Sequence, residues 1–128
     1  MNSRLESIIL NIVSWNINGK NLLINSNYTQ KFLQSFDIIL LSETHTIQGD
    51  KIKVESFENY DFPDLNCNPE YPRGGTCILI KKHLKMYIQS VCKVKTDCIK
   101  IELVNGNHIN SVYIHPTNEL CRISFIPK

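Results

Sequence analysis

The sequence SIILNIVSWNINGK, residues 7–20, contains the pattern that decides the fold. Residues 7–15 form a nearly continuous apolar run rich in β-branched side chains, which is typical of a central strand buried on both faces. The run ends in an Asn/Gly cluster, which predicts a turn or loop. The chain is therefore expected to place a buried strand first, with a polar loop at the C-terminal end of that strand.

A helix and a second strand are predicted after this loop. Residues 28–36 repeat apolar side chains at the spacing of a short amphipathic helix, namely Tyr28, Phe32, Leu33 and Phe36. Asn27 precedes them as the predicted N-cap. Residues 37–42, DIILLS, form a second fully apolar run and a second buried strand. Strand, helix and strand in succession predict a β-α-β unit with a right-handed crossover.

The rest of the chain favours loops and then antiparallel strands. Residues 44–72 are polar and predict long loops with one short strand near residues 51–57. Four strand candidates follow, at residues 75–81, 86–94, 98–104 and 108–114. Apolar and charged side chains alternate in the third candidate, and Asn105-Gly106 after it is typical of a hairpin turn. We expect an α+β chain with a mixed sheet, and residues 117–128 show no strand pattern that would cover its edge.

Composition sets broad limits on the function. The 128 residues are enough for one domain with a buried core, and the 42% hydrophobic and 20% charged fractions exclude disordered and fibrous classes. The net charge of +2 neither indicates nor excludes a nucleic-acid partner. None of the five cysteines forms a C-x-x-C pair, so reduced thiols in a reducing compartment are expected. No apolar run reaches the roughly 20 residues of a membrane span, and we expect a cytoplasmic or nuclear protein without a membrane partner.

Polar side chains follow both predicted buried strands at their C-terminal ends. Asn16 and Asn18 follow the first strand, and Glu43 follows the second. Ligands bind at this rim in open α/β sheets, because the loops there are free while the strands fix their ends. A carboxylate in this position either reaches solvent or has a cation beside it, and Mg²⁺ takes carboxylate oxygen while keeping several waters. A solvated Glu43 and two ordinary turn residues are the alternative interpretation.

Four segments, in order, resemble motifs of the endonuclease/exonuclease/phosphatase superfamily. They are IVSWNINGK (residues 12–20), IILLSETH (residues 38–45), RGGTCILIKK (residues 73–82) and VYIHPTN (residues 112–118). They are most similar to the apurinic-type endonuclease domains of LINE-type retrotransposons, where the domain is associated with a reverse transcriptase. The resemblance implies a DNase-I-like sandwich of two packed sheets flanked by helices. It also implies hydrolysis of phosphodiester or phosphomonoester bonds with Mg²⁺ or Mn²⁺, and DNA as the partner.

The resemblance assigns roles to five of these residues. Glu43 and Asn16 would bind the metal, and together with Tyr113 they would form the catalytic group. Asn18, Tyr113 and Asn118 would contact the phosphate. The Tyr113 hydroxyl would donate to an oxygen that gains charge in the transition state. Without the motif, Tyr113 is interpreted as an ordinary strand aromatic.

Two further motifs of the family, G-D-x-N and S-D-H, do not follow Asn118. They would supply the groups that orient water and act as general base, and a general base is worth about 10²–10⁴-fold in rate. We therefore expect residues 1–128 to be one partial domain, the N-terminal half of the fold, which is inactive alone. A sheet surface without its usual cover would favour self-association. A non-catalytic interaction module, or a phosphoesterase of the same superfamily with another phosphate ester as substrate, remains the alternative.

Overall fold

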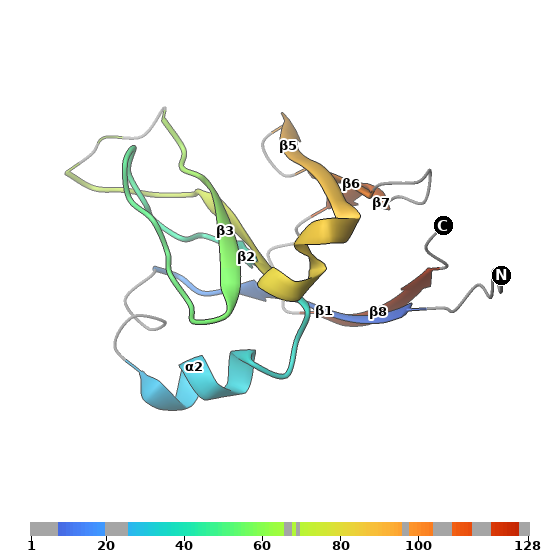
Figure 1. Cartoon of the computed structure of the whole chain (residues 1–128). Helices are drawn as coiled ribbons and strands as arrows, with labels where there is room; N and C mark the ends of the chain where they lie inside the picture. Colours follow the sequence, from blue (N-terminus) through green and yellow to red (C-terminus); the bar gives the residue numbers. More distant parts are fainter. Residues whose placement is uncertain are drawn as a thin grey trace, which may run out of the picture.

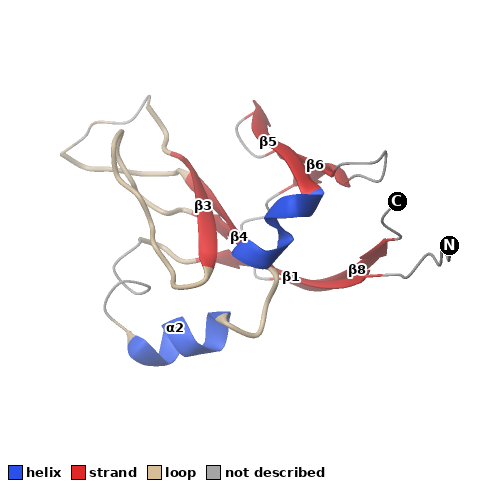
Figure 2. Ribbon diagram, in the orientation of Figure 1, coloured by secondary structure: helices blue, strands red, loops and turns tan. Residues whose placement is uncertain are grey.

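The computed structural model describes residues 8–19, 26–65, 68, 70–95, 98–103, 109–113 and 119–125. Within these residues the chain forms two β-sheets, the helix α2 (Asn27–Leu33) and the 3₁₀-helix η1 (Lys82–Tyr87) (Figures 1 and 2). The larger sheet has the order β3-β4-β2-β1-β8, with β1 (Ile8–Asn16), β2 (Ile38–Ser42), β3 (Phe57–Phe62), β4 (Thr76–Lys81) and β8 (Glu119–Phe125). The smaller sheet has the order β5-β6-β7, with β5 (Ile88–Lys95), β6 (Cys98–Leu103) and β7 (Ile109–Tyr113).

The β-α-β start of the chain is confirmed. Strands β1 and β2 pair in parallel, with α2 between them in the sequence. The helix begins one residue earlier than predicted, because the Ser26 hydroxyl accepts a hydrogen bond from the Thr29 amide at 3.1 Å. The predicted N-cap Asn27 is therefore wrong. Of the helical apolar residues, Leu33 is buried, whereas Tyr28 is 83% exposed.

The antiparallel part of the fold is also confirmed, with three local corrections. Residues 51–54 are not a strand; they form irregular chain in which only Ile52 and Val54 are buried, and β3 begins only at Phe57. Residues 82–87 form η1, so the strand predicted at residues 86–94 starts at Ile88. The C-terminal segment does contain a strand, because β8 pairs antiparallel with β1 and covers its edge. The predicted Asn105-Gly106 turn lies outside the described residues.

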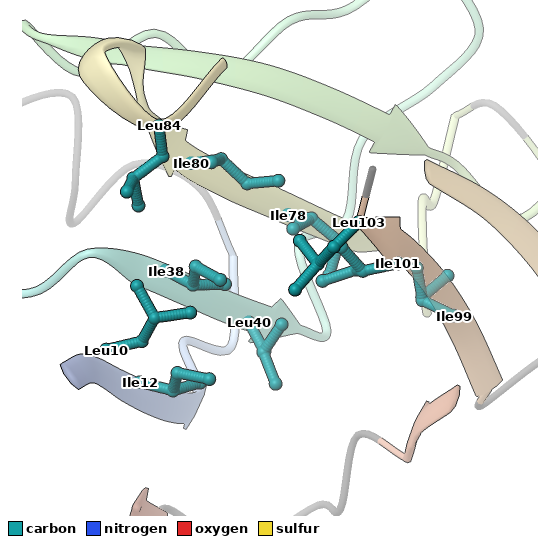
Figure 3. Close-up of a cluster of buried hydrophobic side chains, with 10 residues drawn as sticks. All are labelled: Leu10, Ile12, Ile38, Leu40, Ile78, Ile80, Leu84, Ile99, Ile101 and Leu103. Carbon is teal, nitrogen blue, oxygen red and sulfur yellow. The ribbon is translucent and has the colours of Figure 1, made fainter. Parts of the chain in front are cut away.

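The first half of the core lies between the two sheets. Strands β1, β2 and β4 present one face to β6, and η1 closes the end of this layer (Figure 3). Figure 3 shows the side chains from these elements pointing toward one another. The buried cluster consists of Leu10, Ile12, Ile38, Leu40, Ile78, Ile80, Leu84, Ile99, Ile101 and Leu103. The packing of two sheets that the family resemblance implied is therefore present.

The second half of the core covers the opposite face of the larger sheet. The helix α2, which lies on this side in Figure 1, and the segment leading to β3 pack there. The buried cluster consists of Ile17, Leu33, Phe36, Ile39, Leu41, Ile52, Val54, Phe57, Cys77 and Leu79. All five residues of β2 are buried, and β4 is buried from Thr76 to Ile80. The expectation of an uncovered sheet surface is therefore wrong for these two central strands.

Burial also changes the chemistry of one thiol in the second cluster. Burial raises the pKa of Cys77 well above its ordinary value of 9.0, and the neighbouring Asp61 carboxylate raises it further. The folded state thus favours the neutral thiol over the thiolate.

No helix among the described residues is long and apolar enough to cross a membrane.

The raised pKa of Cys77 predicts a loss of stability in alkaline solution. A raised pKa in the folded state stabilises the fold fully below the unfolded pKa, and the stabilisation disappears as the pH rises through the folded value. We expect the free energy of unfolding in urea to fall as the pH rises above the ordinary thiol value of 9.0, and Cys77→Ala to flatten this dependence. Desolvation also raises the pKa of Tyr60, so Tyr60→Phe separates the two contributions. Cys92→Ala is the control, because that thiol is exposed, and an unchanged slope in Cys77→Ala would contradict the assignment.

Candidate functional site

The parallel pairing of β1 and β2 brings three predicted residues to one edge of the larger sheet. Asn16 lies opposite Ser42, and Glu43 follows directly. The Ile17 amide donates to the Ser42 carbonyl at 3.1 Å, and the Gly19 amide donates to the Glu43 carbonyl at 2.8 Å. These bonds hold the loop after β1 against the loop after β2. We call residues 16–19 and 43–47 the rim; it contains Asn16, Asn18 and Glu43.

The backbone of the rim is locally strained. Three non-glycine residues have left-handed backbone angles, with φ of 48° at Asn18, 53° at Glu43 and 56° at His45. The Asn18 amide donates to the Asn16 side-chain oxygen at 3.2 Å, a local turn that asparagine commonly forms. Left-handed geometry at an ordinary residue costs roughly 1–2 kcal/mol. Such residues persist only where their surroundings over-determine the backbone, and they cluster at functional sites.

A third loop holds the rim from the other side. The Thr44 amide donates to the Gly75 carbonyl at 3.3 Å, and the His45 amide donates to the Gly74 carbonyl at 2.8 Å. Gly75 has φ of +86°, and a Cβ there would lie 2.5 Å from the Thr44 Oγ1. Only glycine allows this approach without a shift of the neighbouring chain. The segment RGGT thus positions the loop that carries Glu43, a role that its sequence did not reveal.

A row of hydroxyl groups lies beneath the rim. Asn16, Ser42 and Thr76 are register partners across β1, β2 and β4, and Ser14 precedes Asn16 on the same face. The hydroxyls of Ser14, Ser42 and Thr76 are buried and have no hydrogen-bond partner in the described part of the chain. A buried unsatisfied hydroxyl costs about 1–3 kcal/mol. The row marks where the apolar layer between the sheets gives way to polar groups, and hydroxyls inside apolar strand runs were the sequence signal for it.

The structure describes Tyr113 and Asn118, the two remaining predicted site residues, only in part or not at all. Tyr113 is the last residue of β7 in the smaller sheet, and its backbone lies opposite Cys98. The side chain of Tyr113 and the whole of Asn118 lie outside the described residues. The structure therefore brings together Asn16, Asn18 and Glu43, and the position of the other two relative to them stays a prediction.

The side chains of the rim can be compared with the ligands that divalent metal ions prefer. Over the described residues, no group of three or more His, Cys, Asp and Glu side chains is arranged to hold a metal. Glu43 is half-buried at the open end of the strands, beside the amide-bearing loop of Asn16. One carboxylate with amide oxygens does not suit zinc in a structural site, which takes four protein ligands. It does suit Mg²⁺ or Mn²⁺, because a hard ion keeps several waters and binds one or two carboxylates.

Comparison with known proteins identifies the family of the chain. The model of the Endonuclease/Exonuclease/phosphatase family matches residues 13–119, a segment that includes β1 from Val13, the whole rim and Tyr113. No curated protein matches the sequence. Enzymes of this family hydrolyse phosphate esters, including those of nucleic acids, and are generally dependent on a divalent metal. Because the match covers most of the chain and agrees with the two-sheet fold, the chain belongs to the endonuclease/exonuclease/phosphatase family.

Proposed function

We propose that the rim is the metal-binding end of a nucleic-acid phosphodiesterase site that uses Mg²⁺ or Mn²⁺. The apurinic-type endonuclease domains of LINE-type retrotransposons are the proposed subgroup, DNA is the proposed substrate, and the cytoplasm or nucleus is the proposed location. The observation that carries the proposal is the pairing of Asn16 with Ser42, which sets Glu43 beside the asparagine loop. A carboxylate and two amides at the ends of parallel strands fit a hard divalent ion and a phosphate.

Each residue has a distinct part in this proposal. The Glu43 carboxylate would bind the ion, and the Asn16 amide oxygen would complete the protein's share of its ligands. When bound, the ion supplies Lewis-acid polarisation of a phosphoryl oxygen. Asn18, Asn118 and the Tyr113 hydroxyl would donate hydrogen bonds to phosphate oxygens and orient the ester. The hydrogen bond from the Asn18 backbone amide to the Asn16 side-chain oxygen would keep the two asparagines in a fixed position relative to each other.

The 128 residues contain neither a G-D-x-N nor an S-D-H sequence. The chain by itself therefore lacks the motifs that would orient the attacking water and accept its proton. We propose that it binds the metal but does not hydrolyse DNA when tested alone. Purified chain with Mg²⁺ should leave supercoiled plasmid DNA intact; nicking that Glu43→Gln abolishes would overturn the proposed inactivity. Release of phosphate from a phosphomonoester, without nicking, would favour the phosphatase alternative.

Glu43→Gln is expected to weaken Mn²⁺ binding by at least about tenfold, because the carboxylate is the charged ligand of the proposed site. Titration calorimetry with MnCl₂ measures the affinity directly. Glu55→Gln is the matched control, since Glu55 is exposed and lies away from the rim, in the turn before β3. An equal Mn²⁺ affinity in Glu43→Gln and the unaltered chain would refute the metal site.

A further inference from the structure

We infer that Thr44 and Thr46 are positioning residues that fix the backbone at Glu43 and so aim its carboxylate. The inference rests on the proposed function, in which Glu43 is the metal ligand. It assigns no direct contact with metal or phosphate to either threonine.

Burial alternates along the segment that follows β2. Thr44 and Thr46 are fully buried, whereas Glu43 and His45 are half-buried. The threonine side chains are therefore enclosed by the protein, whereas the Glu43 and His45 side chains remain partly accessible to solvent. The Thr44 Oγ1 and the Thr46 Oγ1 lie 3.1 Å apart and form a hydrogen bond. This bond gives each buried hydroxyl a partner, unlike the hydroxyls of the neighbouring strand row.

The threonine pair lies directly under a glycine of the adjacent loop. An added Cβ at Gly75 would be 2.5 Å from the Thr44 Oγ1 and 3.3 Å from the Thr46 Oγ1. The Gly75 carbonyl also accepts a hydrogen bond from the Thr44 amide. Side chain and backbone of Thr44 are thus held by the same glycine. A rotation of the segment about Thr44 would break both contacts.

Among the residues that the structure describes, Glu43 is held through its backbone. Its carbonyl accepts from the Gly19 amide at 2.8 Å, and its φ is 53°. Because Thr44 follows it directly, the packing of Thr44 under Gly75 determines the direction in which the Glu43 side chain leaves the backbone. Loss of the hydrogen bond between the two threonine hydroxyls would let the backbone at Glu43 move, although the Glu43 carboxylate itself would still be present. The metal affinity should then fall because the ligand is less well oriented.

The test uses a substitution that keeps the shape of the side chain. Thr44→Val removes the hydroxyl and should weaken Mn²⁺ binding by about tenfold, as is typical when an orienting partner of a metal ligand is lost. Thr44→Ser retains the hydroxyl and should restore the affinity to within about twofold of the unaltered chain. Thr46→Val, which breaks the same bond from the other side, should reproduce the loss. In a Glu43→Gln background, Thr44→Val should cause no further loss, since the two residues act through one ligand.

A second readout does not depend on the metal. The Gly19 amide donates to the Glu43 carbonyl, so its hydrogen exchange reports the position of the Glu43 backbone. Thr44→Val should accelerate this exchange, and Thr44→Ser should not. If Thr44→Val lowers the melting temperature but changes neither Gly19 exchange nor Mn²⁺ affinity, the positioning role is wrong and the proposed function stands. If Glu43→Gln leaves Mn²⁺ affinity unchanged while Gly19 exchange responds to Thr44→Val, the proposed function fails and the backbone role survives.

Discussion

Ile101→Ala is expected to destabilise the whole chain by about 3 kcal/mol, within the range typical of large-to-small core substitutions. Ile101 is fully buried on β6, in the cluster that joins the smaller sheet to β1, β2 and β4. Removing its side chain leaves a cavity between two sheets that cannot both relax into it. A domain has only about 5–15 kcal/mol of total stability, so the change should be plain in urea unfolding.

The same variant tests whether the two sheets form one cooperative unit. Trp15 is the chain's single tryptophan, and it packs on the opposite face of the larger sheet, 6.5 Å from Phe32 between ring centroids. Its fluorescence therefore reports a region that does not contact Ile101. We expect the fluorescence and far-ultraviolet circular dichroism midpoints to fall together. Met86→Ala, at a 72% exposed position on η1, is the control and should change stability by less than about 0.5 kcal/mol.

A shift in circular dichroism without a shift in Trp15 fluorescence would contradict this picture. It would mean that β5, β6 and β7 unfold separately from the larger sheet. The apolar cluster shown in Figure 3 would then contribute little to the stability of β1 and β2.

The central strands could be predicted from the sequence because their signal is local. A nearly continuous apolar run is typical of a buried strand, and β1 and β2 begin and end within one residue of the predicted limits. All five residues of β2 are buried, whereas Val13 and Trp15 on one face of β1 are only half-buried, so the expectation of burial on both faces is confirmed for β2 and wrong for β1. Strand β8 could not be predicted in this way. Its sequence carries only a short alternation, with Cys121, Ile123 and Phe125 separated by Arg122 and Ser124, and no strand was predicted from it. In the structure this segment pairs with the edge of β1. Tertiary context decides such elements.

The same distinction holds for the site. Asn16, Asn18 and Glu43 could be predicted to lie together, because the ends of neighbouring parallel strands meet at one edge of a sheet. Thr44 and Gly75 could not be predicted to touch each other. Their contact arises only when β4 pairs antiparallel with β2 and brings the two loops together. Sequence patterns show which residues face a sheet edge, but close contacts between distant loops follow from three-dimensional packing.

Gly75→Ala is expected to destabilise the chain by about 3 kcal/mol through two separate effects. The first is conformational, because Gly75 has φ of +86° and a left-handed residue with a side chain costs roughly 1–2 kcal/mol. The second is steric, because the new Cβ would lie 2.5 Å from the Thr44 Oγ1, and overpacking of a buried site typically costs about 1–3 kcal/mol. Urea unfolding of the variant and the unaltered chain measures the sum.

Gly49→Ala separates the two effects, since Gly49 has φ of +95° but, within the described part of the chain, no atom beyond its own chain neighbours lies within 4 Å of its added Cβ. It should lose only the conformational part, roughly 1–2 kcal/mol. The Thr44→Ala background removes the nearest atom, so Gly75→Ala should be less destabilising there than in the unaltered chain, which a double-mutant cycle detects. If Gly75→Ala costs no more than Gly49→Ala, the two loops do not approach as described. That result would refute the close packing of Thr44 beneath Gly75. It would also refute the proposal that this packing supports the strained turn at Glu43.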